Sequence, residues 1–280
     1  MVSASGSAGY YTMENEAFVP GHGRSKITVT SRERDVSPGE SRPGQEAEFT
    51  LVIPAYNEEK RIGLLLSELD GRQTEYIFIC DGNDNTASEI KQWGVHHPEI
   101  SLRCIEHPAR IGKGKAVCEG LTLANTRLAG YMDADGSASY SEMVKLFHQL
   151  DGCDGVIGSR WVAGATIARS QGLVRRFESR IFNRLIRLLF GLQFRDTQCG
   201  AKVFRKDVLD TVLPGIVSPG FEFDVELLWR LIGKGYKISE YPIEWNNRVD
   251  SHVRGPDAVS MLWGLFRLRF GRVRDDTRCE

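Results

Sequence analysis

Several features that would assign this chain to a common class are missing from its 280 residues. The six cysteines are scattered and form no C-x-x-C pair, which argues against a zinc site or a disulfide framework and fits a reducing compartment. No apolar run approaches the ~20 residues that cross a bilayer, and the N-terminus lacks the apolar core of a signal peptide. We therefore expect a protein that is soluble or bound to a membrane surface.

Neither sign of charge dominates the sequence. The 36 basic and 37 acidic residues give a formal net charge of −1, whereas a protein that binds nucleic acid normally carries a basic excess. We therefore expect no nucleic-acid partner.

The first 47 residues also lack sustained periodicity. They are rich in Ser, Gly, Glu, Arg and Pro, and such a segment buries too little apolar area to offset its ordering entropy. We expect residues 1–47 to be a disordered tail, residues 48–253 to form one folded domain, and residues 254–280 to form a basic amphipathic end.

From residue 49 onward, short apolar runs alternate with segments of helical periodicity. Strands are expected at 49–54, 75–80, 102–105 and up to Met132, and helices at about 86–93 and 113–124. Another helix carries Ile62 and Leu65, and Asn57 is its candidate cap. This alternation predicts an α/β domain with a mostly parallel sheet and right-handed crossovers. Ligands of such sheets lie beyond the carboxyl ends of the strands.

The strongest chemical signal is the stretch Met132-Asp133-Ala134-Asp135-Gly136, directly after an apolar strand. Two carboxylates two residues apart can hold a divalent cation where a strand opens into a turn. Hard carboxylate oxygens suit Mg²⁺ or Mn²⁺, which keep positions open for diphosphate oxygens. The ion would neutralise charge on a departing nucleotide diphosphate. The alternative is a pair of solvated surface acids.

Further polar residues follow the neighbouring strands. The first strand ends in Pro54, Ala55, Tyr56, Asn57 and Glu58. A base and a ribose would lie there, and Asp81, which ends the second strand, is placed to accept hydrogen bonds from them. The alternative is a helix cap at Asn57 and a plain turn at Asp81.

A lysine between two glycines, in Arg110-Ile-Gly-Lys-Gly114, stands at the start of an expected helix. Free backbone N–H groups and the Lys113 ammonium would favour an anion there. The stretch lacks the spacing and the Ser/Thr of a P-loop, and a flexible turn is the alternative.

Together these motifs resemble those of glycosyltransferase family 2, and more narrowly its polyprenyl-phosphate sugar synthases. Dolichyl-phosphate glucosyltransferases are the most similar branch, followed by dolichol-phosphate mannosyltransferases. The resemblance covers about residues 49–253, and the order and spacing of its motifs are specific. The matching stretches are Val52-Ile-Pro-Ala-Tyr-Asn-Glu-Glu59, Gly112-Lys-Gly114, Met132-Asp-Ala-Asp-Gly136, Gly158-Ser-Arg160, Arg195-Asp-Thr-Gln-Cys-Gly200 and Phe223-Asp-Val-Glu-Leu-Leu228.

The resemblance implies a GT-A fold with one Rossmann-like domain, a divalent metal, a nucleotide-sugar donor, and inversion at the anomeric carbon. By their motifs, Asp133 and Asp135 are assigned to the metal and the diphosphate, with Asp135 favoured as the direct metal ligand. Lys113 and Arg160 are assigned as further catalytic residues. Asp81 and residues 54–58 would hold the nucleoside. The acceptor phosphate side is assigned to Arg160, Arg175, Ser179, Asp196, Gln198, Asp224 and Glu226. For the last two, helix capping and surface charge are the alternative.

One departure concerns the donor. The family usually has two aspartates before the glycine that follows the second strand, but the first is Cys80 here. The resemblance favours UDP-glucose, and GDP-mannose and UDP-N-acetylglucosamine stay open as alternatives.

Two stretches suggest contact with a membrane. Leucines, Phe177 and Ile181 recur at helical spacing across 173–192, flanked by five arginines, and a second apolar stretch at 259–266 leads into four more arginines. This is the pattern of amphipathic helices lying in a bilayer interface. We expect the protein to be peripheral, on the cytoplasmic face of a membrane. The alternative is an ordinary helix packed on the sheet.

Three other functions compete. A GT-A transferase with a non-lipid glycan acceptor would not need the arginine-flanked helix. A nucleotidyltransferase would need a glycine-rich loop after the first strand, where this chain has Pro54-Ala-Tyr-Asn-Glu58. A catalytically silent membrane-docking subunit would not need Asp133, Asp135, Lys113 and Arg160.

Overall fold

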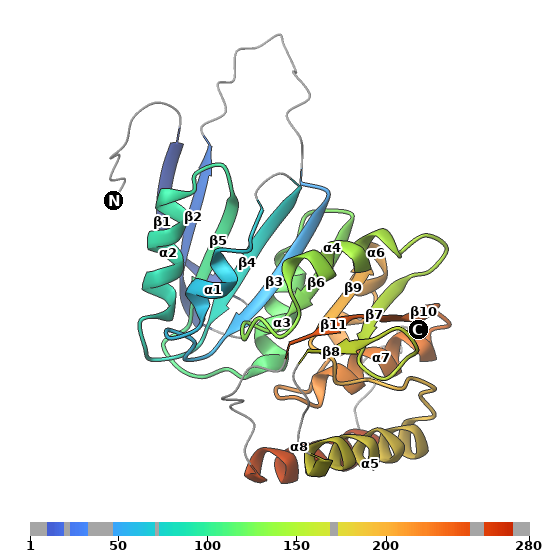
Figure 1. Cartoon of the computed structure of the whole chain (residues 1–280). Helices are drawn as coiled ribbons and strands as arrows, with labels where there is room; N and C mark the ends of the chain where they lie inside the picture. Colours follow the sequence, from blue (N-terminus) through green and yellow to red (C-terminus); the bar gives the residue numbers. More distant parts are fainter. Residues whose placement is uncertain are drawn as a thin grey trace, which may run out of the picture.

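The computed structural model describes residues 10–19, 23–32, 47–70, 73–168, 173–246 and 255–270. A nine-stranded sheet forms the centre, with helices on both faces (Figure 1). Its strands are β1 (Tyr10–Val19), β2 (Gly23–Arg32), β3 (Phe49–Ala55), β4 (Thr74–Cys80), β5 (Ser101–Glu106), β6 (Leu128–Met132), β7 (Gly155–Ser159), β9 (Ala201–Arg205) and β10 (Ile238–Pro242). A separate two-stranded sheet is formed by β8 (Thr166–Ile167) and β11 (Glu244–Trp245). The helices are α1 (Ile62–Leu66), α2 (Thr86–His96), α3 (Lys113–Leu123), α4 (Tyr140–His148), α5 (Leu173–Phe190), α6 (Lys206–Asp210), the short 3-10 helix η1 (Leu213–Gly215), α7 (Phe223–Gly233) and α8 (Gly255–Phe270).

The strand order in the large sheet is β1-β2-β5-β4-β3-β6-β9-β7-β10. Strands β5, β4, β3 and β6 are parallel, β9 is antiparallel to both β6 and β7, and β10 is parallel to β7. With β2 antiparallel to β5 and to β1, seven of the nine strands point one way. The mostly parallel, Rossmann-like sheet expected from the sequence is confirmed. The chain runs outward from β3 through β4 and β5 and then returns to β6, so the topological switch point lies between β3 and β6.

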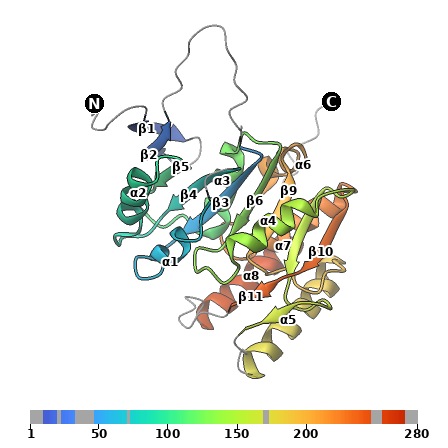
Figure 2. The same ribbon diagram turned by 45° about the horizontal axis from the view of Figure 1, so that its top comes forward.

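Alternate side chains of the central strands pack into two cores. On β3, Leu51 and Ile53 join the core that contains residues of α1, α2 and α4, while Val52 joins the core formed with α3 and α7. Strand β4 alternates in the same way through Phe78 and Ile79. Because both faces of these strands are covered, each strand is a nearly continuous apolar run in the sequence. The result is a three-layer arrangement (Figures 1 and 2).

The expectation of a disordered tail over residues 1–47 is wrong for two described segments within it. Strands β1 and β2 pair with each other, with Tyr10 opposite Arg32 and Val19 opposite Gly23. Strand β2 also pairs with β5, from Lys26 opposite Glu106 to Thr30 opposite Leu102. The physical reason is that β5 would otherwise be an edge strand with unpaired backbone groups. Bulk composition does not reveal such edge pairing.

Helices α5 and α8 lie next to each other at the bottom of the view in Figure 1, where Arg269 Nε donates to the Leu189 carbonyl over 2.8 Å. Their inner side chains belong to the second core, including Ile186, Phe190, Leu265 and Leu268. Within the described ranges, no helix is both long enough and apolar enough to cross a membrane.

This packing corrects part of the membrane prediction for residues 173–192. Leu192 is buried and Leu189 packs against the core, so neither is available to lipid. Leu188 is 82% exposed, while the side chains of Phe177 and Ile181 lie outside the described part. The exposed apolar surface is instead concentrated on α8, at Trp263 (73%), Phe266 (43%) and Phe270 (68%).

Candidate active site

A cavity of about 440 Å³ lies at the carboxyl ends of β3, β4 and β6, at the switch point of the sheet. Nine of the ten residues assigned to the donor site line it. They are Pro54, Ala55, Tyr56, Glu58, Asp81, Lys113, Asp133, Ala134 and Asp135. Three separate strand ends therefore bring together residues that are up to 81 positions apart, 54 to 135, in the sequence.

Asn57 is the tenth residue, and it has a structural role. Its backbone is in the left-handed region with a φ of 55°, and its Oδ1 accepts a hydrogen bond from Asn83 N at 2.9 Å. The turn after β4 is thereby fixed against the end of β3. The proposed cap of α1 is also wrong, because Arg61 is the N-cap residue and makes no side-chain capping bond.

Asp81 secures the start of α3. Its Oδ2 accepts hydrogen bonds from Ile111 N and Gly112 N, both at 2.9 Å. The Gly114 N–H donates to Pro219 O at 2.9 Å. Three backbone N–H groups of this loop thus already have acceptors, and its cationic side chains that line the cavity are Arg110 and Lys113.

The turn that contains Asp133 and Asp135 follows the end of β6. Gly136 has a φ of 64°, and Asp135 Oδ1 accepts a hydrogen bond from Ser137 N at 2.8 Å. Lys113 Nζ lies 2.8 Å from Asp133 Oδ1. Within the described residues, no group of three or more His, Cys, Asp or Glu side chains could hold a metal ion. Two carboxylates would leave most positions of Mg²⁺ or Mn²⁺ open to water or to a ligand, which suits a cation shared with a diphosphate.

A buried charged cluster lies behind Lys113. Asp224 accepts hydrogen bonds from Tyr131 Oη at 2.5 Å and from Lys202 Nζ, and it lies 3.5 Å from Lys113 Nζ. Burial would raise the pKa of Asp224, but the two ammonium groups outweigh burial and hold that pKa below its ordinary value. Burial likewise opposes the charge of Lys113, yet Asp133 and Asp224 raise its pKa. Both groups are therefore charged at neutral pH.

On the other wall, Glu58 forms a two-pronged ion pair with Arg61, with Nε and Nη2 each 2.8 Å from a carboxylate oxygen. Burial raises the pKa of Glu58 to about 7 despite Arg61, and the carboxylates of Asp135 and Asp133 add to the rise. The Arg110 guanidinium lies 4.2 Å from the centroid of the Tyr56 ring. The cavity thus carries charged groups of both signs.

Sequence reasoning missed one wall of the cavity. It consists of the segment Pro219, Gly220, Phe221 and Glu222 before α7, together with Met261 of α8. The close approach depends on Gly112, whose φ is 92° and where an added Cβ would lie 2.5 Å from Pro219 O. The Ser-Pro-Gly sequence at 218–220 indicates a turn, but it does not reveal which surface the turn contacts.

The acceptor-side residues whose side chains the structure describes do not line this cavity. Arg160 forms a two-pronged pair with Asp196, at 2.7 Å through Nε and 2.9 Å through Nη2. Gln198 has a buried Nε2 that finds no hydrogen-bond acceptor within the described residues. The side chains of Arg175 and Ser179 lie outside the described part, although both belong to α5.

Asp224 and Glu226 are both fully buried, so surface charge is excluded for either. Asp224 faces Lys113, on the donor side, as described above. Glu226 accepts hydrogen bonds from Ser218 N at 2.8 Å and Arg230 Nε at 2.8 Å. It therefore fixes the segment before α7.

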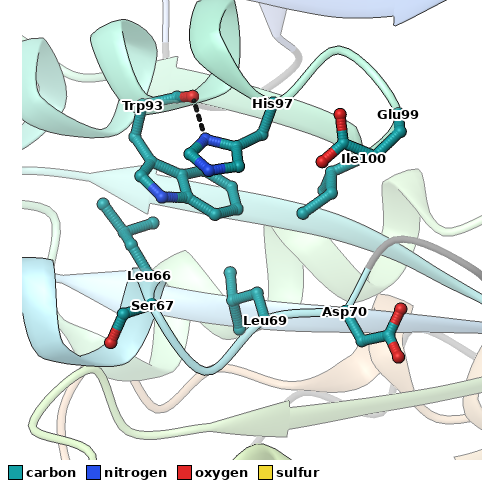
Figure 3. A pocket seen from close by; sticks show the side chains of 8 residues that line it. All are labelled: Leu66, Ser67, Leu69, Asp70, Trp93, His97, Glu99 and Ile100. Atoms are coloured by element: carbon teal, nitrogen blue, oxygen red, sulfur yellow. Dashed lines mark hydrogen bonds between the residues drawn. The ribbon is translucent and has the colours of Figure 1, made fainter.

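A second cavity, of about 590 Å³, lies between the ends of α1 and α2 (Figure 3). Trp93 and His97 stack with ring centroids 4.1 Å apart, and His97 Nδ1 lies 2.8 Å from the Trp93 carbonyl oxygen. None of the assigned residues whose side chains the structure describes lines this cavity.

Residues 50–213 match the family described as Glycosyl transferase family 2. This match covers more than half of the chain. The chain belongs to glycosyl transferase family 2. The resemblance inferred from the motifs is thereby confirmed, and the family 2 assignment agrees with the sheet topology described above.

The chain is similar in sequence to proteins of other organisms that are named for dolichyl-phosphate or polyprenol-phosphate sugar synthesis. A dolichyl-phosphate beta-glucosyltransferase of Trichomonas vaginalis is 31% identical over 80% of this chain and 71% of its own. A polyprenol monophosphomannose synthase of Mycolicibacterium smegmatis is 30% identical over 88% of this chain and 98% of its own. The dolichyl-phosphate beta-glucosyltransferase of Saccharomyces cerevisiae is 28% identical over 86% and 80%.

Solved structures support the GT-A fold. A mannosyltransferase of Pyrobaculum calidifontis, in complex with GDP-Man and Mn²⁺, aligns with a TM-score of 0.56 at 16% identity, over 84% of this chain and 67% of its own. The glucosyl-3-phosphoglycerate synthase of Mycobacterium tuberculosis, with Mn²⁺, UDP and its product, aligns with a TM-score of 0.56 at 16% identity, over 82% and 86%. At these identities the likeness concerns the fold alone.

Proposed function

We propose that this family 2 protein transfers a sugar from a nucleotide-sugar to a polyprenyl or dolichyl phosphate, with inversion at the anomeric carbon. The observation that carries the proposal is the single cavity lined by nine of the ten residues assigned to the donor. Its volume of about 440 Å³ is typical of small-molecule sites. The names of the relatives from three organisms support a lipid phosphate as the acceptor.

In the proposed reaction, a lipid phosphate oxygen attacks the anomeric carbon, and the bond from that carbon to the diphosphate oxygen breaks. The acceptor is already an anion, so no side chain has to remove a proton from it. Negative charge develops on the leaving diphosphate, and the ammonium of Lys113 is available to stabilise it. A divalent cation bound by Asp133 and Asp135 would neutralise more of that charge.

For the acceptor phosphate we propose Arg160, Gln198, Arg175 and Ser179. Arg160 has two of its nitrogens engaged by Asp196, so it would act as a fixed guanidinium whose remaining N–H groups are free to donate. The unpartnered Nε2 of Gln198 is a second donor. Asp196 is then a positioning residue for Arg160.

We further propose that the protein binds the cytoplasmic face of a membrane through α8 and α5. Exposed Trp263, Phe266 and Phe270 would enter the interface, and exposed Arg267 and Arg269 would meet anionic headgroups. Met261 of the same helix lines the donor cavity, so this contact would bring the lipid phosphate toward the donor.

The test is a transfer assay with radiolabelled UDP-glucose, UDP-N-acetylglucosamine and GDP-mannose. Each is incubated with a polyprenyl phosphate, and the label in the lipid extract is counted. We expect UDP-glucose to be the best donor, with GDP-mannose and UDP-N-acetylglucosamine as the alternatives. Label that appears only on a water-soluble glycan acceptor would contradict the lipid acceptor, and tighter calorimetric binding of GDP than of UDP would contradict the uridine donor.

A further inference from the structure

Lys113 lies between two carboxylates that differ in how they are satisfied. Its Nζ is 2.8 Å from Asp133 Oδ1 and 3.5 Å from Asp224 Oδ2. The first distance is that of a hydrogen-bonded ion pair, and the second is too long for a good hydrogen bond. Asp133 is also a ligand of the proposed cation. Lys113 and the cation therefore compete for the same carboxylate.

Asp224 has the geometry of a second acceptor for Lys113. Its Oδ1 takes both the Tyr131 hydroxyl and the Lys202 ammonium. Lys202 is itself fully buried and donates to the Cys199 carbonyl at 2.6 Å, so it cannot turn away. Tyr131 and Lys202 face each other across the β6–β9 pair. These contacts fix the orientation of the Asp224 carboxylate.

The other oxygen of Asp224 is left without a hydrogen bond. Within the described residues, Oδ2 is buried and accepts from no donor. A buried acceptor without a donor costs free energy, and the ammonium of Lys113 lies 3.5 Å from this oxygen. Shortening this contact from 3.5 Å to 2.8 Å would take a shift of about 0.7 Å, well within the reach of a lysine side chain.

We propose that Lys113 moves from Asp133 to Asp224 when a divalent cation binds at the Asp133–Asp135 turn. The proposal rests on the metal assignment in the proposed function. In the free protein, Lys113 neutralises Asp133. After the exchange the cation pairs with Asp133, and Lys113 satisfies the open oxygen of Asp224. Each buried charge keeps a partner in both states, which is the condition for a low-cost exchange.

The exchange has a consequence for the order of binding. The cation alone has to displace an ammonium from Asp133, so the free protein binds it weakly. A diphosphate that arrives with the cation supplies negative charge for Lys113 and removes part of that penalty. Cation and donor therefore bind cooperatively, and Lys113 sets the size of the cooperativity.

The test is a double-mutant cycle on Mn²⁺ binding without nucleotide, read from the electron paramagnetic resonance signal of free Mn²⁺. The proteins are wild type, Lys113→Met, Asp224→Asn and the double variant. We expect Lys113→Met to bind Mn²⁺ roughly tenfold more tightly and Asp224→Asn several-fold more weakly, on the scale of couplings between contacting charges. In the double variant, the effect of Asp224→Asn disappears, because no lysine remains to be moved.

The cycle separates this proposal from simple attraction between charges. If Asp224→Asn weakens Mn²⁺ binding equally with and without Lys113, Asp224 acts through space and the exchange is refuted. If neither wild type nor Lys113→Met binds Mn²⁺ even with UDP present, the metal assignment fails instead.

A second measurement needs no change at Asp224. In protein labelled with ¹³C at lysine Cε, with the signal assigned by Lys113→Met, the Lys113 resonance should shift on addition of diamagnetic Mg²⁺ and UDP. The Lys202 resonance, whose ion pair is kept, should shift far less. An unmoved Lys113 resonance at saturating Mg²⁺ and UDP would refute the exchange.

Discussion

The part of the chain up to Gly136 and the part after it hold their polar side chains differently. In the first part, the assigned residues follow three parallel strands and face one cavity, as Asp81 and Asp135 do. In the second part, the described assigned residues other than Gln198 are paired inside the protein. Arg160 pairs with Asp196, and Glu226 pairs with Arg230 and two backbone N–H groups.

This difference separates residues placed to bind a ligand from residues that stabilise the fold. A charge directed into a cavity is stabilised fully only when a ligand arrives, whereas a charge paired inside the protein is already satisfied. Substitutions before residue 136 should therefore reduce activity more than stability. Substitutions of the paired residues after it should reduce stability first.

The largest effect is expected for Asp135→Asn in the first part. Loss of one carboxylate from the proposed cation site should lower transfer by about three orders of magnitude, which equals roughly 4 kcal/mol of transition-state stabilisation. Thermal unfolding should hardly change, because the amide oxygen can still accept from Ser137 N. The readout is label transferred to extracted lipid, with EDTA-treated wild type in parallel. Full turnover in either sample would contradict the assignment of a required cation to this site.

The next largest effect is expected for Asp196→Ala in the second part. Arg160 would keep a charge that is only 12% exposed and lose its partner, so the free energy of unfolding should fall by about 3 kcal/mol. The matched control is Asp207→Ala, which breaks the Arg205 pair whose side chains are 50% and 64% exposed. That variant should leave stability nearly unchanged, because exposed ion pairs contribute little. Urea unfolding of the three proteins measures both values, and equal losses would contradict the distinction.

The sequence predicted the first part well because its information is local. Strands that are buried on both faces are continuous apolar runs, and motifs directly after them must lie at one edge of the sheet, as Asp81, Asp133 and Lys113 do. The hydrogen bond that Asn57 makes to the turn after β4 was not predicted, because its partner lies 26 residues away and no local pattern indicates it.

The second part could not be predicted in the same way. The pairing of Lys202 with Asp224 and of Arg160 with Asp196 depends on which elements meet in space. Strands β1 and β2 were missed because their pairing with β5 satisfies an edge and leaves little trace in composition. The fold class could be predicted from periodicity, but the pairing of these charged side chains depends on the three-dimensional structure.

A smaller effect is expected at Gly200, where the two parts meet. An added Cβ there would lie 1.8 Å from Asp133 Oδ2, so Gly200→Ala forces the carboxylate to move. We expect a loss of about 2 kcal/mol in stability, in the range of overpacking, together with weaker Mn²⁺ binding. The control is Gly63→Ala in α1, where nothing lies within 4 Å of the added Cβ and stability should be unchanged or slightly higher. Normal Mn²⁺ binding in Gly200→Ala would show that Asp133 does not need its present position.

The smallest effect is expected at Trp263 on the exposed surface of α8, which lines neither cavity. Trp263 is 73% exposed, and Trp263→Ser should weaken partition onto anionic liposomes by about fivefold, or about 1 kcal/mol, as a partly inserted aromatic ring is lost. Val95→Ser, on α2 and 57% exposed, is the matched control and should leave partition unchanged. Higher salt should weaken binding of all three proteins, because it screens the attraction of Arg267 and Arg269 to headgroups. Flotation of liposomes measures the partition. Equal flotation of the Trp263 variant and wild type would assign α8 to packing alone and would leave the lipid acceptor without a route of approach along this helix.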